Sequence, residues 1–413
     1  MGKPKIRFEG YSEDWEQRKL GEVCEIKDSA RIPNSEWSES GIPYIRASDV
    51  TNENTDGVLF ISQERYEFYK NRTGAPTKND VLFNGGGKIG KSLLITDEKP
   101  IYVQGGAVLY ARTSKSRELV GQYLKTYFET TNAKSYIDAA SAGGTMRHFT
   151  LKPSQKMRIL MPSVEEQEKI GGYFVNLDRL ITLHQRKYDE TKTLKKYMLQ
   201  KMFPQNGEKV PEIRFDGFTE DWEQRKLGDI TTKIGSGKTP KGGAAAYKDD
   251  GIALIRSQNV NGDRVDLSDV VFIDEQTDED MKNSRVLKGD VLLNITGASI
   301  GRSAVFTREL RANVNQHVCI IRTKGSDASP EFIQLNIISS NGQNQIDSFQ
   351  AGGGREGLNF HQIGKMEFLY PGIEEQQKIG QYFANLDHLI TLHQRKCNEL
   401  KEIKKYMLQN MFV

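Results

Sequence analysis

Apolar residues recur with heptad spacing in two stretches of the chain, residues 165–203 and 374–412. Successive apolar positions alternate between intervals of four and three residues, which is typical of a helix that buries a narrow seam against another helix. The predicted seam contains Ile170, Phe174, Leu177 and Ile181 in the first stretch and Ile379, Phe383, Leu386 and Ile390 in the second. We therefore expect two long helices, each roughly 58 Å long at about 1.5 Å per residue, packed as an antiparallel coiled coil.

The polar seam positions His184, His393 and Thr191 are interpreted as tolerated seam residues and not as ligands. Proline and serine at 162 and 163, followed by two glutamates, suit a helix start, because acidic residues favour the positive end of the helix dipole. Pro204 ends the first helix.

The two stretches belong to a tandem repeat. Residues 165–203 match 374–412 at 29 of 39 positions, and residues 6–23 match 213–230 at 13 of 18, whereas the interiors share only scattered positions. Two copies of about 200 residues are too few and too long for a solenoid, so we interpret the chain as a duplicated domain pair.

The expected fold class is α+β, with two α/β domains in tandem joined by the two helices. The predicted divisions are a first domain over 1–162, a long helix over 163–203, a linker over 204–212, a second domain over 213–371 and a second long helix over 372–413.

The stretch GGGKIGKS at residues 85–92 matches the nucleotide-binding pattern G-x-x-x-x-G-K-[ST]. Such a loop needs a strand before it and a helix after it, whose N-terminal amides hold the phosphates. Residues 80–83 read as a strand, but residues 93–103 are apolar, β-branched and contain a proline, which predicts strand, turn and strand. The equivalent residues 295–303 lack the first glycine and carry arginine in place of the lysine. We therefore interpret the match as accidental and expect this chain to bind no ATP.

Composition narrows the class of protein further. The 413 residues are 37% hydrophobic, no apolar run approaches the roughly 18 residues of a membrane span, and no apolar segment follows the basic N-terminus. We expect a cytoplasmic protein without membrane contact. The three cysteines are odd in number and far apart, which argues against disulfides and a thiolate metal site. We expect no metal.

Both domains carry glycine-rich polar loops between short strands, and these loops contain the residue types that read base edges. Arginine pairs with guanine, and asparagine or glutamine pairs with adenine, while glycine lets the backbone come close. The candidates for DNA contact are Arg46, Ser48, Asn84, Lys88, Lys91, Arg147 and His148 in the first domain and Arg256, Gln258, Asn259, Asn294, Thr296, Arg302, Gln316 and Arg355 in the second.

Some of these candidates have an equally good structural explanation. Arg46 and Arg256 can be strand-end salt bridges, and Asp49 is expected to orient a neighbouring arginine. Trp15 and Trp222 are expected to pack at the base of each domain. Charge supports DNA binding unevenly: residues 1–162 carry 24 Lys and Arg against 20 Asp and Glu, whereas residues 213–371 carry 19 against 22.

The order of motifs along the whole chain resembles the specificity subunit of type I restriction-modification systems. Each copy opens on Trp-Glu-Gln-Arg-Lys-Leu-Gly and closes on Pro-x-x-Glu-Glu-Gln-x-Lys-Ile. Further matches are the Asp-Val-Leu segments at 80–82 and 290–292, Ile-Gly at 89–90 and 300–301, and Asn-Gln-His at 315–317.

The resemblance implies a non-catalytic DNA-reading subunit. In that family each target recognition domain reads one half of a split, asymmetric target in double-stranded DNA, and the helices form a spacer on which two modification subunits dock. Those subunits methylate adenine N6 with S-adenosylmethionine, and restriction subunits add ATP- and Mg²⁺-dependent translocation and cleavage. This chain would itself bind none of these cofactors.

Two catalytic interpretations fail on the residues, and one other class remains. An adenine methyltransferase would need an Asn-Pro or Asp-Pro step, which is absent. A nuclease would want a Glu-x-Lys triplet on a strand near a second carboxylate, and the triplets at 190–192 and 399–401 fall within predicted helices, where positions i and i+2 point apart. The remaining alternative is a non-enzymatic adaptor that binds proteins through two domains on a coiled coil.

Overall fold

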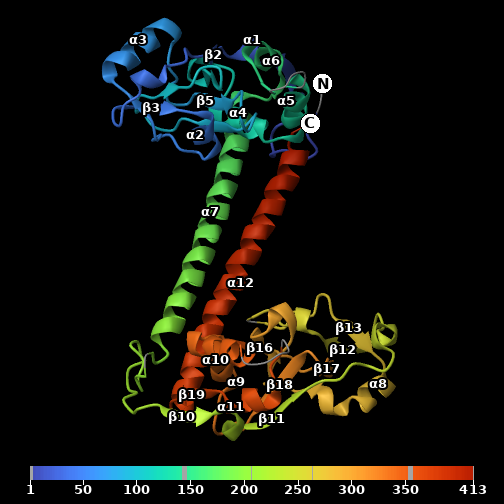
Figure 1. The fold of residues 1–413 in the computed structure, drawn as a ribbon. Coiled ribbons are helices and arrows are strands. Elements are labelled where there is room, and N and C mark those ends of the chain that lie inside the picture. The colour runs from blue at the N-terminus through green and yellow to red at the C-terminus, as the bar shows by residue number, and fades with distance from the viewer. Residues whose placement is uncertain (1–2, 142–146, 206, 263, 352–356, 413) are drawn as a thin grey trace. The chain divides into compact units, whose positions relative to one another are not determined.

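The structure is a computed structural model that describes residues 3–141, 147–205, 207–262, 264–351 and 357–412. The chain divides into two compact units (Figure 1). The first contains residues 1–184 and 395–413, and the second contains residues 185–394. Each unit therefore includes the C-terminal part of the long helix that belongs to the other sequence repeat.

The described residues of the first unit form three small sheets. Its strands are β1 (Glu16–Lys19), β2 (Ile26–Asp28), β3 (Ile42–Ile45), β4 (Phe60–Ile61), β5 (Val81–Asn84), β6 (Ser92–Leu94), β7 (Tyr102–Val103), β8 (Val108–Ala111) and β9 (Arg158–Met161). The antiparallel order β2-β8-β5-β6 forms the main sheet, and β4-β3-β7 forms the second, with β3 and β7 parallel. Strands β1 and β9 pair at the start and end of the domain, which closes it next to the long helix.

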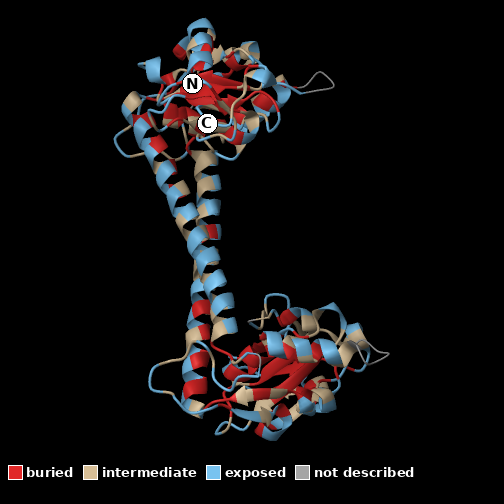
Figure 2. Cartoon of the chain, turned by 60° about the vertical axis from the view of Figure 1, so that its left-hand side comes forward, coloured by how far each residue is buried: buried red, intermediate tan, exposed pale blue. Residues whose placement is uncertain are grey.

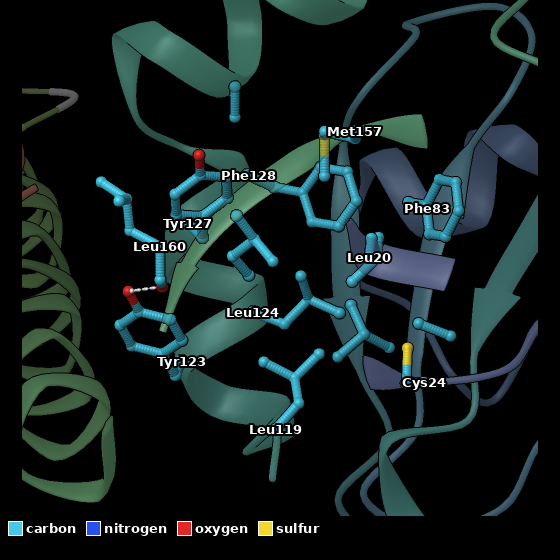
Figure 3. Packing of buried hydrophobic residues seen from close by; sticks show 14 of the residues in the cluster. Leu20, Cys24, Phe83, Leu119, Tyr123, Leu124, Tyr127, Phe128, Met157 and Leu160 are labelled. Atoms are coloured by element: carbon cyan, nitrogen blue, oxygen red, sulfur yellow. Dashed lines mark hydrogen bonds between the residues drawn. The ribbon is translucent and has the colours of Figure 1, made fainter. Parts of the chain in front are cut away.

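The helices of the first unit lie on both faces of its main sheet, since Val50 packs in the cluster of Leu82 and Tyr123 packs in that of Phe83. They are α1 (Leu20–Val23), α2 (Ala47–Thr51), α3 (Gln63–Thr73), α4 (Gly121–Phe128), α5 (Thr131–Ala140), α6 (Leu151–Lys156) and α7 (Val164–Lys201). Side chains of α4 pack with Leu20 and Phe83 in the core, and the hydroxyl of Tyr123 donates to the carbonyl oxygen of Leu160 at 2.7 Å (Figure 3).

The second unit repeats this plan. Its strands are β10 (Glu223–Lys226), β11 (Thr231–Ser236), β12 (Ile252–Ile255), β13 (Val271–Ile273), β14 (Arg285–Val286), β15 (Val291–Asn294), β16 (Ser303–Val305), β17 (Ala312–Val314), β18 (Val318–Thr323) and β19 (Glu367–Tyr370). Its helices are α8 (Glu275–Asp280), α9 (Pro330–Ile338), α10 (Ser340–Ala351), α11 (Phe360–Lys365) and α12 (Ile373–Asn410). The sheets are β11-β18-β15-β16, β13-β12-β17-β14 and β10-β19. The described elements confirm the α+β class, and buried residues form the interior of each unit (Figure 2).

The end of α12 completes the core of the first unit. Phe412 is 5% exposed, and its ring centroid lies 5.5 Å from that of Tyr123 and 6.0 Å from that of Phe174. The backbone amide of Ile6 donates to the carbonyl oxygen of Asn410 at 3.0 Å. The apolar seam residues at the start of α7 therefore pack in the domain core together with the tip of the other long helix.

The second unit contains the equivalent contacts. Phe203, just after α7, packs on Phe332 with ring centroids 5.4 Å apart and on Trp222 at 6.1 Å. The amide of Ile213 donates to the carbonyl oxygen of Lys201 at 2.9 Å. In each unit the core is completed by the end of the long helix from the other repeat. Because both helix ends have this same role, their last residues are nearly identical.

Ion pairs fix how the two long helices pair. In the first unit the Lys404 ammonium lies 2.6 Å from carboxylate oxygens of both Asp178 and Glu129, and in the second unit Lys195 pairs with Asp387 at the equivalent position. Burial alone would lower the pKa of Lys404, but the two carboxylates outweigh it and raise the pKa above its ordinary value. Each pair joins an early residue of one helix to a late residue of the other, so the predicted antiparallel arrangement is confirmed.

The predicted seam is buried at its domain ends and half-buried beyond them. Ile170, Phe174 and Leu177 are buried in the first core, and Ile379, Phe383 and Leu386 are buried in the second. The next seam positions, Ile181 and Ile390, are only partly covered. The apolar residues of the heptad pattern therefore have two roles. They pack in the domain core at the start of each helix, and they contact the other helix further along.

A buried ion pair joins the N-terminus of each long helix to its domain. Arg7 binds both carboxylate oxygens of Glu166, at 2.7 and 2.8 Å, and the Trp15 indole donates to the same carboxylate at 3.2 Å. Arg214 binds Glu375 in the same way in the second unit. Trp15 is 1% exposed, as is Trp222, which confirms their predicted packing role.

Three remaining expectations can be compared with the described residues. No helix opens on residues 85–92, which connect β5 to β6 as a hairpin. No helix in the described part of the chain is long and apolar enough to cross a membrane, and the described His, Cys, Asp and Glu residues form no group suited to a metal. Burial raises the pKa of the thiols of Cys24 and Cys319 to about 12, so both stay protonated, as expected of inert buried cysteines.

Candidate nucleic-acid interface

The glycine loop of the first unit is held rigidly at its base by Asn84, the last residue of β5. The Asn84 amide group donates to the carbonyl oxygen of Ala47 at 2.8 Å and to the hydroxyl of Thr51 at 3.0 Å, which joins the loop to α2. Its backbone closes the hairpin through hydrogen bonds with Gly90 and Lys91. The loop therefore projects from a fixed base.

The structure brings Arg147 and His148 next to this loop. The amide of Phe149 donates to the carbonyl oxygen of Gly85 at 2.8 Å. A Cβ at position 85 would lie 2.7 Å from the Phe149 carbonyl oxygen, so only glycine allows this approach. Arg147 and His148 are exposed, and together with Gly87, Ile89 and Asp138 they line a shallow hollow. Two of the predicted segments thus form one surface.

The α2 candidates lie on the other side of Asn84. Arg46 precedes α2, and its guanidinium pairs with the buried Asp49 at 3.1 Å, while Asp49 also accepts from the Arg46 backbone amide at 2.9 Å. Of the two interpretations left open by the sequence, the salt bridge is the one seen. Ser48, the second residue of α2, is exposed.

The second unit contains the same frame, by which we mean the buried asparagine at the end of a strand and the segment to which its amide group is hydrogen-bonded. It is built from equivalent residues. Asn294 ends β15, and its amide group donates to the carbonyl oxygen of Ser257 at 2.9 Å. Asn259 takes the place of Asp49, because its side-chain oxygen accepts from the Arg256 amide at 2.9 Å. Arg256 donates to the carbonyl oxygen of Asp269, also at 2.9 Å, and is therefore largely committed to the protein.

The half-buried polar side chains on the second frame differ from the exposed ones on the first. The Thr296 hydroxyl lies 2.6 Å from Nδ1 of His317, and Nε2 of His317 lies 2.8 Å from the Gln316 amide nitrogen. Because that amide nitrogen can only donate, Nε2 accepts, and Nδ1–H then donates to Thr296. His317 therefore holds Thr296 and Gln316 in fixed orientations. Our candidate set omitted His317, although the Asn-Gln-His segment was the signal for it.

The other candidates of the second unit are less informative. Arg302 and Gln258 are exposed, and Gln258 bonds to Asp269. Arg355 lies outside the described residues.

Three asparagines that the sequence suggested as DNA contacts are buried in the structure. Asn84 and Asn294 are 0% exposed, and Asn259 is 2% exposed. Their amide groups donate to backbone carbonyl oxygens of the protein, so none of them can contact a base in this conformation. The sequence-based assignment of these three as DNA contacts is corrected: they position the loops that carry the exposed residues.

A family model described as the type I restriction modification DNA specificity domain matches residues 12–193 and again residues 219–402. The two matches cover both sequence repeats, and each includes the beginning of a long helix.

Curated relatives are similar over most of their length. The chain is 24% identical over 411 residues to the type I restriction enzyme EcoBI specificity subunit of Escherichia coli, covering 91% of this chain and 81% of that subunit. It is 20% identical to the MjaVIII specificity subunit of Methanocaldococcus jannaschii, covering 96% and 91%. The crystal structure of the type I restriction-modification S subunit from M. genitalium superposes with a TM-score of 0.64 at 14% identity, covering 100% of this chain and 99% of that one.

Proposed function

Because the chain belongs to the type I restriction-modification DNA specificity family, we propose that each of its two domains reads one half of a bipartite, asymmetric target in double-stranded DNA. The observation that carries this proposal is the contrast between frame and surface. Equivalent asparagines hold equivalent loops in both units, whereas the polar residues on and beside those loops are the exposed Lys88, Lys91 and Arg147 in one unit and the half-buried Thr296 and Gln316 in the other. One frame with two different surfaces suits two different half-sites.

The chain supplies recognition, and partner subunits supply the chemistry. In this proposal two modification subunits methylate adenine N6 with S-adenosylmethionine, and restriction subunits use ATP and Mg²⁺ to cleave DNA. The residues of this chain bind, orient and space the DNA target.

The long helices support docking of two copies of one partner. In the first unit Leu180 directly precedes the seam residue Ile181, and Ile403 directly precedes Lys404, which pairs with Asp178 of the other helix. Positions of this kind lie along one face of an antiparallel pair. Tyr406 follows Ile403 by three residues on that face. Their exposed fractions are 41%, 45% and 56%.

The same surface recurs in the second unit. Its members are Leu389, Leu194 and Tyr197, which are 40%, 43% and 47% exposed. Apolar side chains that stay exposed at equivalent positions of both repeats, while the domain interiors differ, are suited to two identical partner surfaces. We assign these surfaces to the two modification subunits.

The substitutions Tyr406→Asp and Tyr197→Asp test this docking surface. A carboxylate placed in an apolar contact must lose its hydration without a partner, so each variant should remove one of the two modification subunits. Native mass spectrometry of the purified complex should then show one modification subunit per chain in each single variant. Tyr406→Phe keeps the ring and is the matched control. Two bound modification subunits in both aspartate variants would contradict the assignment.

The central test is a methylome. The chain is co-expressed with its modification subunits in a host without DNA methylation, and N6-methyladenine is mapped by single-molecule sequencing. We expect a two-part motif with a fixed gap that appears only when this chain is present.

The protein-binding adaptor makes the opposite prediction. It predicts no motif even when the modification subunits co-purify with the chain, and it predicts no steep dependence of DNA affinity on salt, because that dependence comes from phosphate contacts.

A further inference from the structure

The GGGKIGKS loop presents backbone rather than side chains at its tip. Gly87 and Gly90 have φ of 67° and 75°, values that favour glycine, and Gly85 is required by the close approach of Phe149. The amides of Gly87 and Lys88 donate to no described residue. Successive free N–H groups beside left-handed residues form concave anion sites in proteins.

The charges around the loop favour an anion. Lys88 and Lys91 are exposed and form no ion pair with a described residue. Arg147 faces the same hollow, but Asp138 compensates its charge at 2.9 Å. His148 packs over Gly86, where a Cβ would lie 3.4 Å from the imidazole. The two lysines are therefore the uncompensated cations of the loop.

Base reading needs side-chain donors and acceptors held in a fixed pattern, and the side chains of this loop do not supply one. Three successive glycines have no side chain, and a lysine ammonium is a point charge on a flexible stem. The equivalent loop of the second unit is the contrast, because His317 fixes both Thr296 and Gln316. The two loops occupy the same place on the frame but are equipped for different contacts.

We propose that the GGGKIGKS loop of the first domain binds a phosphate group of the DNA backbone through its free amides and through Lys88 and Lys91, and reads no base. In the second domain, Thr296 of the equivalent loop and Gln316 of the neighbouring turn between β17 and β18 read a base edge. The assignment rests on the proposed function. It also gives the nucleotide-like motif a physical task, since the same backbone chemistry that cradles phosphates in nucleotide-binding loops serves a DNA phosphate here.

The test compares the double variant K88A/K91A with Q316A in the complex with modification subunits. DNA affinity is measured over a range of salt concentrations, and the methylated motif is mapped for each variant. K88A/K91A should keep both half-sites unchanged and reduce the slope of log affinity against log salt by about 1 to 2, since each phosphate contact contributes about 0.9. Q316A should relax one position of the second half-site and leave the slope unchanged.

Matched variants separate charge from shape. K88R/K91R keeps both positive charges and should retain the wild-type slope. An unchanged slope in K88A/K91A, or an altered first half-site, would overturn the phosphate assignment. A wild-type complex that methylates no motif and binds no DNA would overturn the proposed function and this assignment together, so the two failures are distinguishable.

Discussion

Truncation of Phe412 to alanine is expected to destabilise the first domain by about 3 to 5 kcal/mol, although Phe412 is the penultimate residue of the chain. The ring is 5% exposed and packs among Trp15, Tyr123, Tyr127 and Phe174. Removing it leaves a cavity that the surrounding aromatic rings, which come from three different segments, can only partly fill. Native-state hydrogen exchange measures the effect separately for each unit, through the amides of β5 and β8 and those of β15 and β18.

Phe203→Ala is the matched variant, because Phe203 occupies the equivalent place in the second unit. Each variant should lower the protection of its own unit, so Phe412→Ala acts on β5 and β8 and Phe203→Ala acts on β15 and β18. Val175→Ala, at a half-exposed position of α7, should change the free energy of unfolding by no more than about 0.5 kcal/mol. Unchanged protection of β5 and β8 in Phe412→Ala would show that the helix end does not complete the first core.

Insertion of one heptad into both long helices is expected to widen the gap of the DNA target and to leave both half-sites unchanged. Duplicating residues 185–191 in α7 and 391–397 in α12 adds roughly 10 Å to each helix, which corresponds to about three base pairs. Seven residues preserve the phase of the seam. The insertions also lie between the ion pairs Asp178–Lys404 and Lys195–Asp387, so both pairs can still form. Mapping of N6-methyladenine then reports the new gap directly.

An insertion in α7 alone is the control for this experiment. It lengthens one helix and not the other, so the two ion pairs cannot both keep their register, and methylation should be lost or strongly reduced. If the double insertion changed either half-site, base reading and spacing would not be separate tasks of this chain.

The interface was predictable from the sequence only in part. Glycine-rich loops with Lys, Arg and polar residues marked the right segments, and the structure brings residues 85–91 and 147–148 together. The pattern could not separate Asn84 and Asn294, whose amides are turned inward, from the exposed residues beside them. An asparagine suited to a base edge is equally suited to backbone carbonyl oxygens, and burial alone distinguishes the two roles.

The sequence by itself determined the duplication, the two long helices and their seam, and the absence of a helix after GGGKIGKS. Each of these depends on periodicity or propensity within a few consecutive turns, or on comparison of one repeat with the other. Only the tertiary structure decided that Phe412 completes the core of the first unit and Phe203 that of the second, that Arg7 neutralises Glu166, and that His317 orients Thr296 and Gln316. These contacts join residues that are distant in sequence, or depend on which side chains burial turns inward, and local pattern carries no information about such pairing.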